Sequence, residues 1–283
     1  MKIIECPRDA MQGLEKFIPT EKKIAYINQL IEVGFDTLDC GSFVSAKAIP
    51  QLSDTAAVLN QLTIPSSSST KLLVIVANTR GAEEASKYDS ISYLGFPLSI
   101  SETFQKRNTN KSIAEALNAV ADMQDICLRT GKELVIYISM GFGNPYQDSY
   151  DESVVGQFTG ILSTLGIKII SLADTIGIST PSQITSLFPP LVSQFPDIEF
   201  GMHLHSNPAT AWEKIDAAYR AGCQRFDGAI KGFGGCPMAE DVLVGNLATE
   251  TIVSYLESKG IDTGLNKDAF HKSLLLADSV FIK

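Results

Sequence analysis

The residue pair with the clearest chemical meaning is His203 and His205, two of the three histidines in the chain. They stand two positions apart in a strand-like run over residues 200–205, so both imidazoles point to the same face of that strand. Imidazoles that close together resist joint protonation, and a divalent cation between them removes the conflict. The alternative is a pair of core histidines hydrogen-bonded to backbone groups. Metal binding is favoured because Asp9 and Asn246 offer oxygen ligands on neighbouring predicted loops.

Two imidazoles with oxygen ligands and open positions suit Mg²⁺ or Mn²⁺. Zinc is an alternative, but the chain has no pair of thiolates that would require it. Arg8 precedes Asp9 after the first predicted strand. Such a pair is often a surface ion pair, but at a strand end Arg8 would supply positive charge for an oxyanion or carboxylate. Asp39 lies inside a strand-like run and needs a partner, either Arg8 or the metal. Asp174 stands at the end of another such run. Its carboxylate either caps the end of the strand or takes part in catalysis.

The five cysteines are odd in number, scattered, and without a CxxC pair, which predicts reduced thiols in a cytoplasmic protein. Cys236 differs from the others because it lies in a glycine-rich run, Gly232-Phe233-Gly234-Gly235-Cys236-Pro237. A loop cysteine is usually incidental. The flanking glycines permit hinge motion, so the thiol is a candidate acid or base carried by a lid.

Eight strand-like runs alternate with longer amphipathic segments, and this order predicts a (β/α)₈ barrel in one domain, residues 1–283. A doubly wound sheet would place a glycine-rich turn after the first strand, but the chain has Pro7-Arg8-Asp9-Ala10-Met11-Gln12 there. Residues 270–281 form a last amphipathic helix, expected on the barrel exterior or against another subunit. The predicted strands are residues 3–6, 37–43, 72–77, 91–96, 134–140, 169–173, 200–205 and 226–230. The predicted helices are residues 21–33, 51–61, 81–87, 113–129, 152–165, 182–194, 209–221 and 239–259.

The charge and hydropathy of the chain make polyanionic and membrane partners unfavourable. The net charge is −9, from 32 acidic and 23 basic residues, which disfavours nucleic acid and anionic membrane surfaces. No apolar run approaches the roughly 18 residues of a membrane helix, and no charged leader precedes the first strand. The remaining expectation is a cytoplasmic protein that acts on a small molecule.

Several motifs together resemble the 3-hydroxy-3-methylglutaryl-CoA lyase family, within the barrel metallolyases that include isopropylmalate synthase. The motifs are Pro7-Arg8-Asp9-Ala10-Met11-Gln12, Gly41-Ser42-Phe43-Val44-Ser45-Ala46-Lys47, Ser101-Glu102-Thr103-Phe104, Ser171-Leu172-Ala173-Asp174-Thr175-Ile176-Gly177, His203-Leu204-His205, Gly234-Gly235-Cys236-Pro237 and Gly245-Asn246-Leu247-Ala248-Thr249-Glu250. The resemblance implies that the metal is held by Asp9, His203, His205 and Asn246. It also implies that Arg8 neutralises the charge of a developing enolate and that Cys236 acts from a lid.

The activity implied by the resemblance is cleavage of 3-hydroxy-3-methylglutaryl-CoA to acetyl-CoA and acetoacetate. The general base would be Asp9 or one of the histidines, and Cys236 would protonate the acetyl-CoA carbanion. Several positions depart from the family pattern, among them Asp39, which replaces a glutamate, Ser206, which replaces an aspartate, and Val135, which replaces a basic residue. The alternatives are therefore a sister aldolase or Claisen-type synthase for another hydroxy or oxo acid, and a barrel that binds metal without this chemistry. Such barrels commonly dimerise, and the apolar run at residues 274–276 suggests a homodimer contact.

Overall fold

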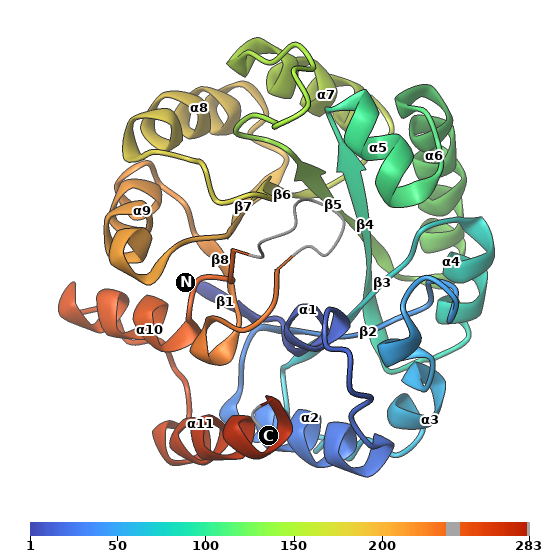
Figure 1. Cartoon of the computed structure of the whole chain (residues 1–283), viewed down its shortest axis with the longest axis vertical. Coiled ribbons are helices and arrows are strands. Elements are labelled where there is room, and N and C mark those ends of the chain that lie inside the picture. Colours follow the sequence, from blue (N-terminus) through green and yellow to red (C-terminus); the bar gives the residue numbers. More distant parts are fainter. Residues whose placement is uncertain (236–243, 282–283) are drawn as a thin grey trace.

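The computed structural model describes residues 1–235 and 244–281, and these residues form a closed barrel of eight parallel strands (Figure 1). Each strand pairs with the next along the chain, and the last closes the ring by pairing with the first. The predicted (β/α)₈ fold is confirmed, and each expected strand is present. The strands are β1 (Lys2–Glu5), β2 (Thr37–Ser42), β3 (Lys71–Ile75), β4 (Ile91–Ser99), β5 (Glu133–Ser139), β6 (Ile169–Asp174), β7 (Glu199–Leu204) and β8 (Arg225–Gly228).

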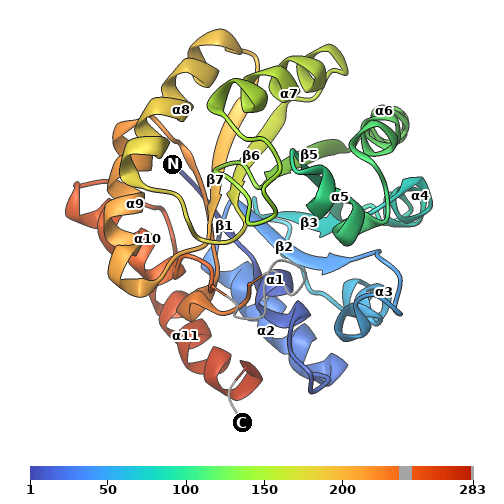
Figure 2. The ribbon, with the colours of Figure 1, turned by 45° about the horizontal axis from the view of Figure 1, so that its top comes forward.

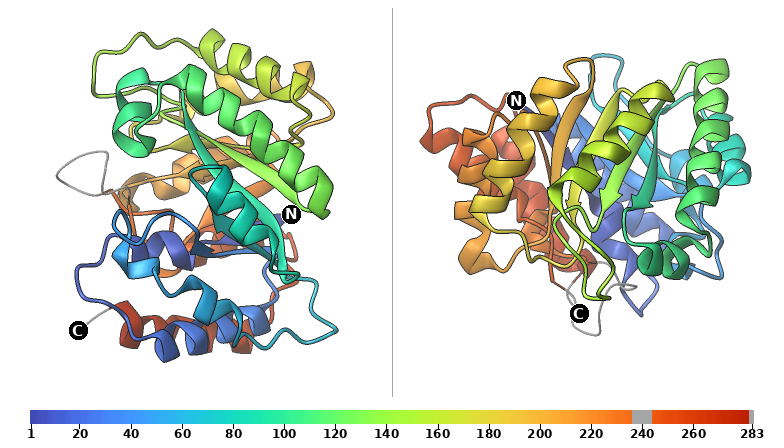
Figure 3. Two further views of the ribbon diagram at one scale, coloured as in Figure 1. Left: turned by 90° about the vertical axis from the view of Figure 1, so that its right-hand side faces the viewer. Right: turned by 90° about the horizontal axis from the view of Figure 1, so that it is seen from above.

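Helices surround the barrel and cover the outer face of its strands, as the side views make plain (Figure 3). The outer helices are α2 (Thr20–Val33), α3 (Thr55–Leu59), α4 (Thr79–Ser86), α5 (Glu102–Thr109), α6 (Ile113–Thr130), α7 (Glu152–Thr164), α8 (Pro181–Gln194), α9 (Pro208–Arg220), α10 (Thr249–Ser258) and α11 (Lys267–Phe281). The short helix α1 (Pro7–Gln12) lies inside this ring, across the barrel (Figures 1 and 2). Two 3₁₀ turns complete the described elements, η1 (Pro50–Leu52) and η2 (Ile230–Gly232).

Helices α1 and α5 are absent from the sequence-based prediction. Pro7 stands in the first turn of α1, where its fixed φ suits a helix and its missing N–H costs nothing. Helix α5 is capped by Ser101, whose hydroxyl accepts a hydrogen bond from the Phe104 backbone N–H. Both helices directly follow strand ends, and both contribute side chains to the cavity at the mouth of the barrel.

The helix predicted over residues 239–259 is wrong over residues 244–248, because helix α10 begins only at Thr249, and residues 239–243 lie outside the described residues. Residues 244–248 form no helix, and two of them form β-bridges instead. The backbone N–H of Leu247 donates to Leu204, and its carbonyl accepts from Ala229, so this segment lies along the ends of β7 and β8. The extended backbone brings Asn246 next to His205, which a helix would not do.

The strands bury two different cores. Their outward-facing side chains pack with the surrounding helices in one large apolar cluster. Inside the barrel, the half that faces β3 to β6 is apolar, with Leu73, Ile75, Tyr93, Val135, Tyr137 and Ile169 in contact. The other half carries buried polar side chains from β2, β7 and β8, namely Asp39, His203, Arg225 and Asp227. This division places charge on one side of the interior and apolar surface on the other.

Glu5 connects β1 to the segments that follow β8, at the point where the barrel closes. Its fully buried carboxyl accepts hydrogen bonds from the Ile230 backbone N–H, after β8, and from the Thr249 hydroxyl, at the start of α10. Burial is the main influence on this group and raises its pKa from 4.5 to about 8. The folded protein therefore holds a proton on Glu5 at pH values where the unfolded chain has lost it.

Replacing Glu5 with glutamine is expected to remove a loss of stability that accompanies rising pH. Between pH 5 and 8 the folded state binds the Glu5 proton more tightly than the unfolded state, so wild-type stability falls by about 1.4 kcal/mol per pH unit from this group. The Glu5→Gln variant should gain on the order of 4 kcal/mol relative to wild type over that interval. Urea unfolding at pH 5 and pH 8 measures the difference, and equal slopes with pH in the two proteins would refute the assignment.

Helix α11 packs against α2 on the barrel exterior, which is one of the two positions expected for it (Figures 1 and 3). Edge-to-face aromatic pairs fix the contact, with ring centroids 5.4 Å apart for Tyr26 and Phe281 and 6.0 Å apart for Phe35 and Phe270. Within the described residues, no helix combines the length and apolar character needed to cross a bilayer.

Candidate metal centre

The two histidines predicted as metal ligands lie side by side at the end of β7. Nδ1 of His203 is 3.2 Å from the Asp227 carboxylate, and Nδ1 of His205 is 2.9 Å from the Val244 carbonyl. Both partners are acceptors, which assigns the imidazole proton of each neutral ring to Nδ1. The two Nε2 atoms then face each other as bare lone pairs, 3.3 Å apart. A cation between them resolves this repulsion, so the pair fits a divalent metal ion.

Asp9 and Asn246 add oxygen donors from two other segments. Asp9, on α1, has a carboxylate oxygen in a group with the two histidines whose ligand atoms all lie within 4.8 Å of one another. The amide nitrogen of Asn246 donates to Asp9 at 2.6 Å and to the Phe233 carbonyl at 2.9 Å. Both amide hydrogens are thereby used, and the amide oxygen is the atom that Asn246 has left to offer. The structure thus brings all four predicted ligands together.

The electrostatics of this cluster favour deprotonated Asp9 and His205. Burial alone would raise the pKa of Asp9, but Arg8, the two imidazoles and the Asn246 hydrogen bond lower it to about 2. Burial and the neighbouring His203 lower the pKa of His205 to about 4. Burial lowers the pKa of His203, but Asp227 and Asp9 together outweigh this effect, so that its pKa is raised from its ordinary value. Asp9 and His205 therefore carry no proton at neutral pH.

Arg8 is the partner of Asp39, one of the two partners that the sequence left open. Its Nε and Nη2 both donate to the Asp39 carboxylate, the first at 3.0 Å. Its Nη1 donates to Asp9 and to Gln12, each at 2.9 Å. Among the described residues these contacts use four of the five guanidinium N–H groups, which leaves one on Nη2. Arg8 is thus a fixed buried charge beside the candidate ligands, and one of its N–H groups is available to a bound ligand.

A cavity of about 170 Å³ opens over this cluster at the mouth of the barrel. One side of it is charged and is lined by Arg8, Asp9, His203 and His205. Most of the remaining lining is apolar and comes from the segment after β2, from β3, β4 and α5, with Val44, Ile49, Ile75, Ala77, Pro97 and Phe104. Polar side chains are interspersed there, namely Asn108, Thr109, Ser139 and Thr175. The cavity therefore suits a small ligand with a polar, metal-binding end and an apolar remainder.

Asp174 lies at the end of β6 but does not line the cavity. Its carboxylate accepts hydrogen bonds from the backbone N–H groups of Ile178 and Ser179 and from the Lys214 ammonium, 2.9 Å away. Lys214 is itself buried and also donates to the carbonyls of Gly177 and His205. These contacts match the capping role that the sequence left open for Asp174, and they connect it to the backbone of a candidate ligand.

Replacing Lys214 with methionine is expected to cost roughly 3 to 5 kcal/mol of stability, because it leaves the Asp174 carboxylate charged, buried and without its cation. The double variant Lys214→Met/Asp174→Asn should recover most of that loss, since it removes the uncompensated charge as well. Denaturant unfolding of the two variants measures both terms. Equal stability of the single and double variants would contradict a buried ion pair.

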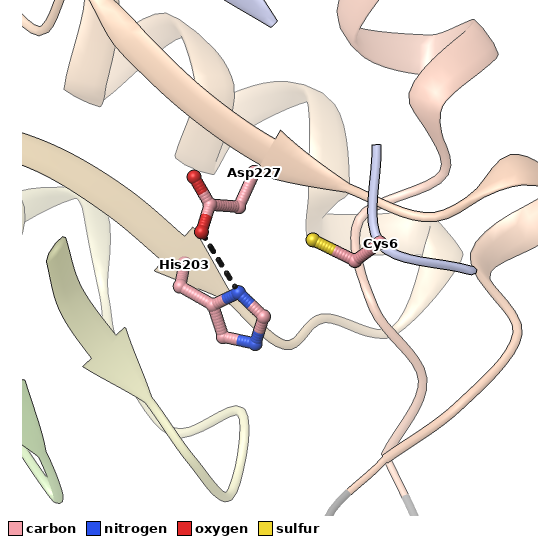
Figure 4. A group of neighbouring side chains, drawn as sticks. All are labelled: Cys6, His203 and Asp227. Carbon is pink, nitrogen blue, oxygen red and sulfur yellow. Dashed lines mark hydrogen bonds and ion pairs between the residues drawn. The ribbon is translucent and has the colours of Figure 1, made fainter. Parts of the chain in front are cut away.

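A second group of potential ligands lies deeper, below the first, and consists of Cys6, His203 and Asp227 (Figure 4). The thiol of Cys6 points from the end of β1 toward the space beside the Asp227 carboxylate. Burial, reinforced by the negative charges of Asp227 and Asp39, raises the pKa of Cys6 well above its usual range. A thiol that keeps its proton is a poor metal ligand. The group of Asp9, His203 and His205, here called the upper group, is therefore the better candidate for a metal site.

Cys236 lies outside the described residues. Val135, which stands where the resemblance predicts a basic residue, is fully buried in the apolar half of the barrel interior. Two polar residues near the site were not predicted from the sequence. They are Asp227, which contacts His203, and Lys214, which contacts Asp174. The alternation of Arg225 and Asp227 within one strand was the available signal for the first, because both side chains must enter the barrel and need partners there.

Comparison with known proteins identifies the family of this chain. The family model described as HMGL-like matches residues 2–275. The hydroxymethylglutaryl-CoA lyase YngG of Bacillus subtilis is 34% identical over 92% of this chain and 85% of its own. The crystal structure of the B. subtilis HMG-CoA lyase superposes with a TM-score of 0.92 at 31% identity, covering 100% of this chain and 94% of that one. An HMG-CoA lyase from Acinetobacter baumannii in complex with coenzyme A and 3-methylmalate gives 0.91 at 30% identity, covering 99% and 91%. This chain belongs to the HMGL-like family.

Proposed function

We propose that this protein is a carbon–carbon lyase that cleaves 3-hydroxy-3-methylglutaryl-CoA to acetyl-CoA and acetoacetate with the help of a divalent metal ion. The observation that carries the proposal is the pair of Nε2 atoms of His203 and His205, which face each other beside the buried carboxylate of Asp9. The HMGL-like family is a divalent-metal-dependent group. Its relatives from B. subtilis and A. baumannii carry the name of this lyase, and the second was solved with coenzyme A.

The metal ligands in this proposal are Asp9, His203, His205 and Asn246, and the ion is Mg²⁺ or Mn²⁺. Two nitrogen and two oxygen donors leave positions open for substrate oxygens. A bound divalent ion orients a substrate hydroxyl and lowers its pKa. The chain's own contribution is to hold the donors deprotonated and fixed, which the low pKa values of Asp9 and His205 support.

The reaction needs a base, an anion-stabilising group and an acid. Asp9 takes the proton of the C3 hydroxyl, because in this proposal each imidazole binds the metal through Nε2 and carries its proton on Nδ1; C3 becomes the ketone of acetoacetate. The C2–C3 bond breaks, and its electron pair moves to the thioester fragment as an enolate. In this proposal, the N–H of Arg8 that is not used by Asp39, Asp9 or Gln12 donates to the enolate oxygen. A proton then returns to C2 to give acetyl-CoA, a role that the resemblance assigns to Cys236.

One observation favours a second candidate, a sister aldolase or Claisen-type synthase with a different acyl substrate. Val135 adds apolar surface inside the barrel where the resemblance predicts a basic residue. Among the described residues that line the cavity, Arg8 is the only cation apart from the imidazoles. A substrate with fewer negative charges than 3-hydroxy-3-methylglutaryl-CoA would suit this cavity.

Two further properties stay predictions from the sequence. They are a cytoplasmic location and the formation of a homodimer.

The test is incubation of the purified protein with Mg²⁺ or Mn²⁺ and 3-hydroxy-3-methylglutaryl-CoA, followed by measurement of both products. Equimolar acetoacetate and acetyl-CoA, abolished by a chelator and restored by added metal, is the expected result. Bound metal without either product would reject this substrate and favour the sister enzyme. Protein that neither binds metal nor turns over would reject both candidates.

A further inference from the structure

A carboxylate that the proposed reaction does not use lies directly behind one of the candidate metal ligands. Asp227 and His203 are register partners on the neighbouring strands β8 and β7, and the Asp227 side chain is fully buried. Figure 4 shows its carboxylate facing the edge of the imidazole ring that carries Nδ1, 3.2 Å away. The opposite edge of the ring presents Nε2 to His205. The two edges of the ring thus have separate partners, one on each side.

We infer that Asp227 is a positioning residue that holds His203 in the Nδ1–H form and so presents an unprotonated Nε2 to the metal. The inference rests on the proposed metal centre. A neutral imidazole carries its proton on one nitrogen only, and the nitrogen without a proton is the one that can ligate. Carboxylates behind metal-binding histidines fix the ring orientation and raise its basicity in this way.

Other contacts keep the His203 ring in one orientation. The Tyr137 ring packs edge-on against it, with centroids 5.6 Å apart and planes at 79°. His205 does not need an equivalent carboxylate, because its own Nδ1 donates to the Val244 carbonyl. The two ligands are therefore held by different means, one by a side chain that can be replaced and one by the backbone.

The buried charge of Asp227 has a counter-charge two residues away on the same strand. Arg225 enters the barrel from the same face of β8 and is fully buried. Gly201 makes room for it, since a Cβ at that position would lie 2.8 Å from Cδ of Arg225. The guanidinium forms ion pairs with Glu199, at 3.3 Å, and Asp36, at 4.0 Å. Its charge acts on Asp227 through space and not through a hydrogen bond, which partly offsets the cost of burying a carboxylate behind the metal centre.

The first measurement requires no variant. Nitrogen-15 NMR of the metal-free wild-type protein separates protonated from unprotonated ring nitrogens. We expect His203 to be protonated at Nδ1 and not at Nε2 at a pH where the ring is neutral. In Asp227→Asn, whose amide can donate to Nδ1, the Nε2–H form should appear. Wild-type His203 in the Nε2–H form would overturn the inference whatever the variant does.

The second measurement is Mn²⁺ affinity, by titration calorimetry on the metal-free protein. We expect Asp227→Asn to bind Mn²⁺ about 10- to 100-fold more weakly than wild type. The matched control is Cys6→Ser, which alters the third member of the deeper group and leaves the His203–Asp227 contact in place. Its Mn²⁺ affinity should stay within about twofold of wild type.

The outcomes distinguish the positioning role of Asp227 from the existence of the metal centre. Wild type that binds Mn²⁺, with Asp227→Asn binding it equally well and keeping the Nδ1–H form, overturns the positioning role and leaves the proposed metal centre intact. A large loss of affinity in Cys6→Ser also overturns it, because the metal would then sit on the Nδ1 side of His203. Wild type that binds no Mn²⁺ overturns the metal centre itself.

Discussion

Replacement of His203 by alanine is expected to abolish metal binding and lyase activity together. The variant leaves His205 and Asp9 as the remaining members of the upper ligand group. It also leaves Asp227 buried without its hydrogen-bond partner. We expect Mn²⁺ affinity to fall more than the roughly 10- to 100-fold loss typical of removing a partner behind a ligand. We expect kcat/KM to fall by at least about 10³-fold, because a bound metal supplies several kcal/mol of transition-state stabilisation.

Two readouts are needed to interpret this variant. Calorimetric titration of the metal-free protein with Mn²⁺ gives the affinity, and product release at saturating Mn²⁺ gives the activity. The third histidine of the chain, His271 on α11, is a suitable control because it lies outside the cavity lining. His271→Ala should bind and turn over like wild type. Full metal occupancy in His203→Ala would refute the ligand assignment.

Replacement of Arg8 by methionine is expected to reduce kcat by about 10²- to 10³-fold, the usual loss when one donor to a developing oxyanion is removed. The same change leaves Asp39 as an uncompensated buried charge, since both contacts of that carboxylate with Arg8 are lost. This second effect should cost roughly 3 to 5 kcal/mol of stability. The single variant therefore mixes a chemical loss with a structural one.

The double variant Arg8→Met/Asp39→Asn separates the two effects. It removes the positive and negative charges together, so stability should return most of the way to wild type while kcat stays low. Denaturant unfolding and steady-state kinetics on the same preparations test this, with Mn²⁺ affinity as a check because Arg8 also contacts Asp9. Recovery of kcat along with stability would show that Arg8 acts only as the partner of Asp39.

The barrel was predictable because its pattern is long and repeated. Buried β-branched runs and amphipathic segments alternate over the whole chain, and each run is long enough to show its period. Helices α1 and α5 span only six and eight residues, too few to show a helical period clearly. The start of α10 was misplaced for a different reason: residues 245–248 form hydrogen bonds to strand ends that are distant in sequence. No local pattern reports such contacts.

The two histidines were identified as candidates because the chain has only three histidines and two of them fall at the end of one strand, and Asp9 and Asn246 were added as oxygen donors on neighbouring loops. Their partners were not identified. Asp227 and Lys214 act through lateral contacts between neighbouring strands and helices, and such contacts depend on the register of the barrel. The open choice for Asp39 was likewise settled by position, because α1 turns Arg8 back over the end of β2. A sequence indicates which groups need partners, whereas only the fold pairs them.

The deprotonated state of the candidate ligands sets the proton balance of metal uptake. Asp9 and His205 have pKa values of about 2 and about 4, and Asn246 has no proton to release. Metal uptake at neutral pH therefore displaces no proton from Asp9, His205 or Asn246. Of the four candidate ligands, His203, whose pKa is raised from its ordinary value, is the one through which protons compete with the metal as the pH falls.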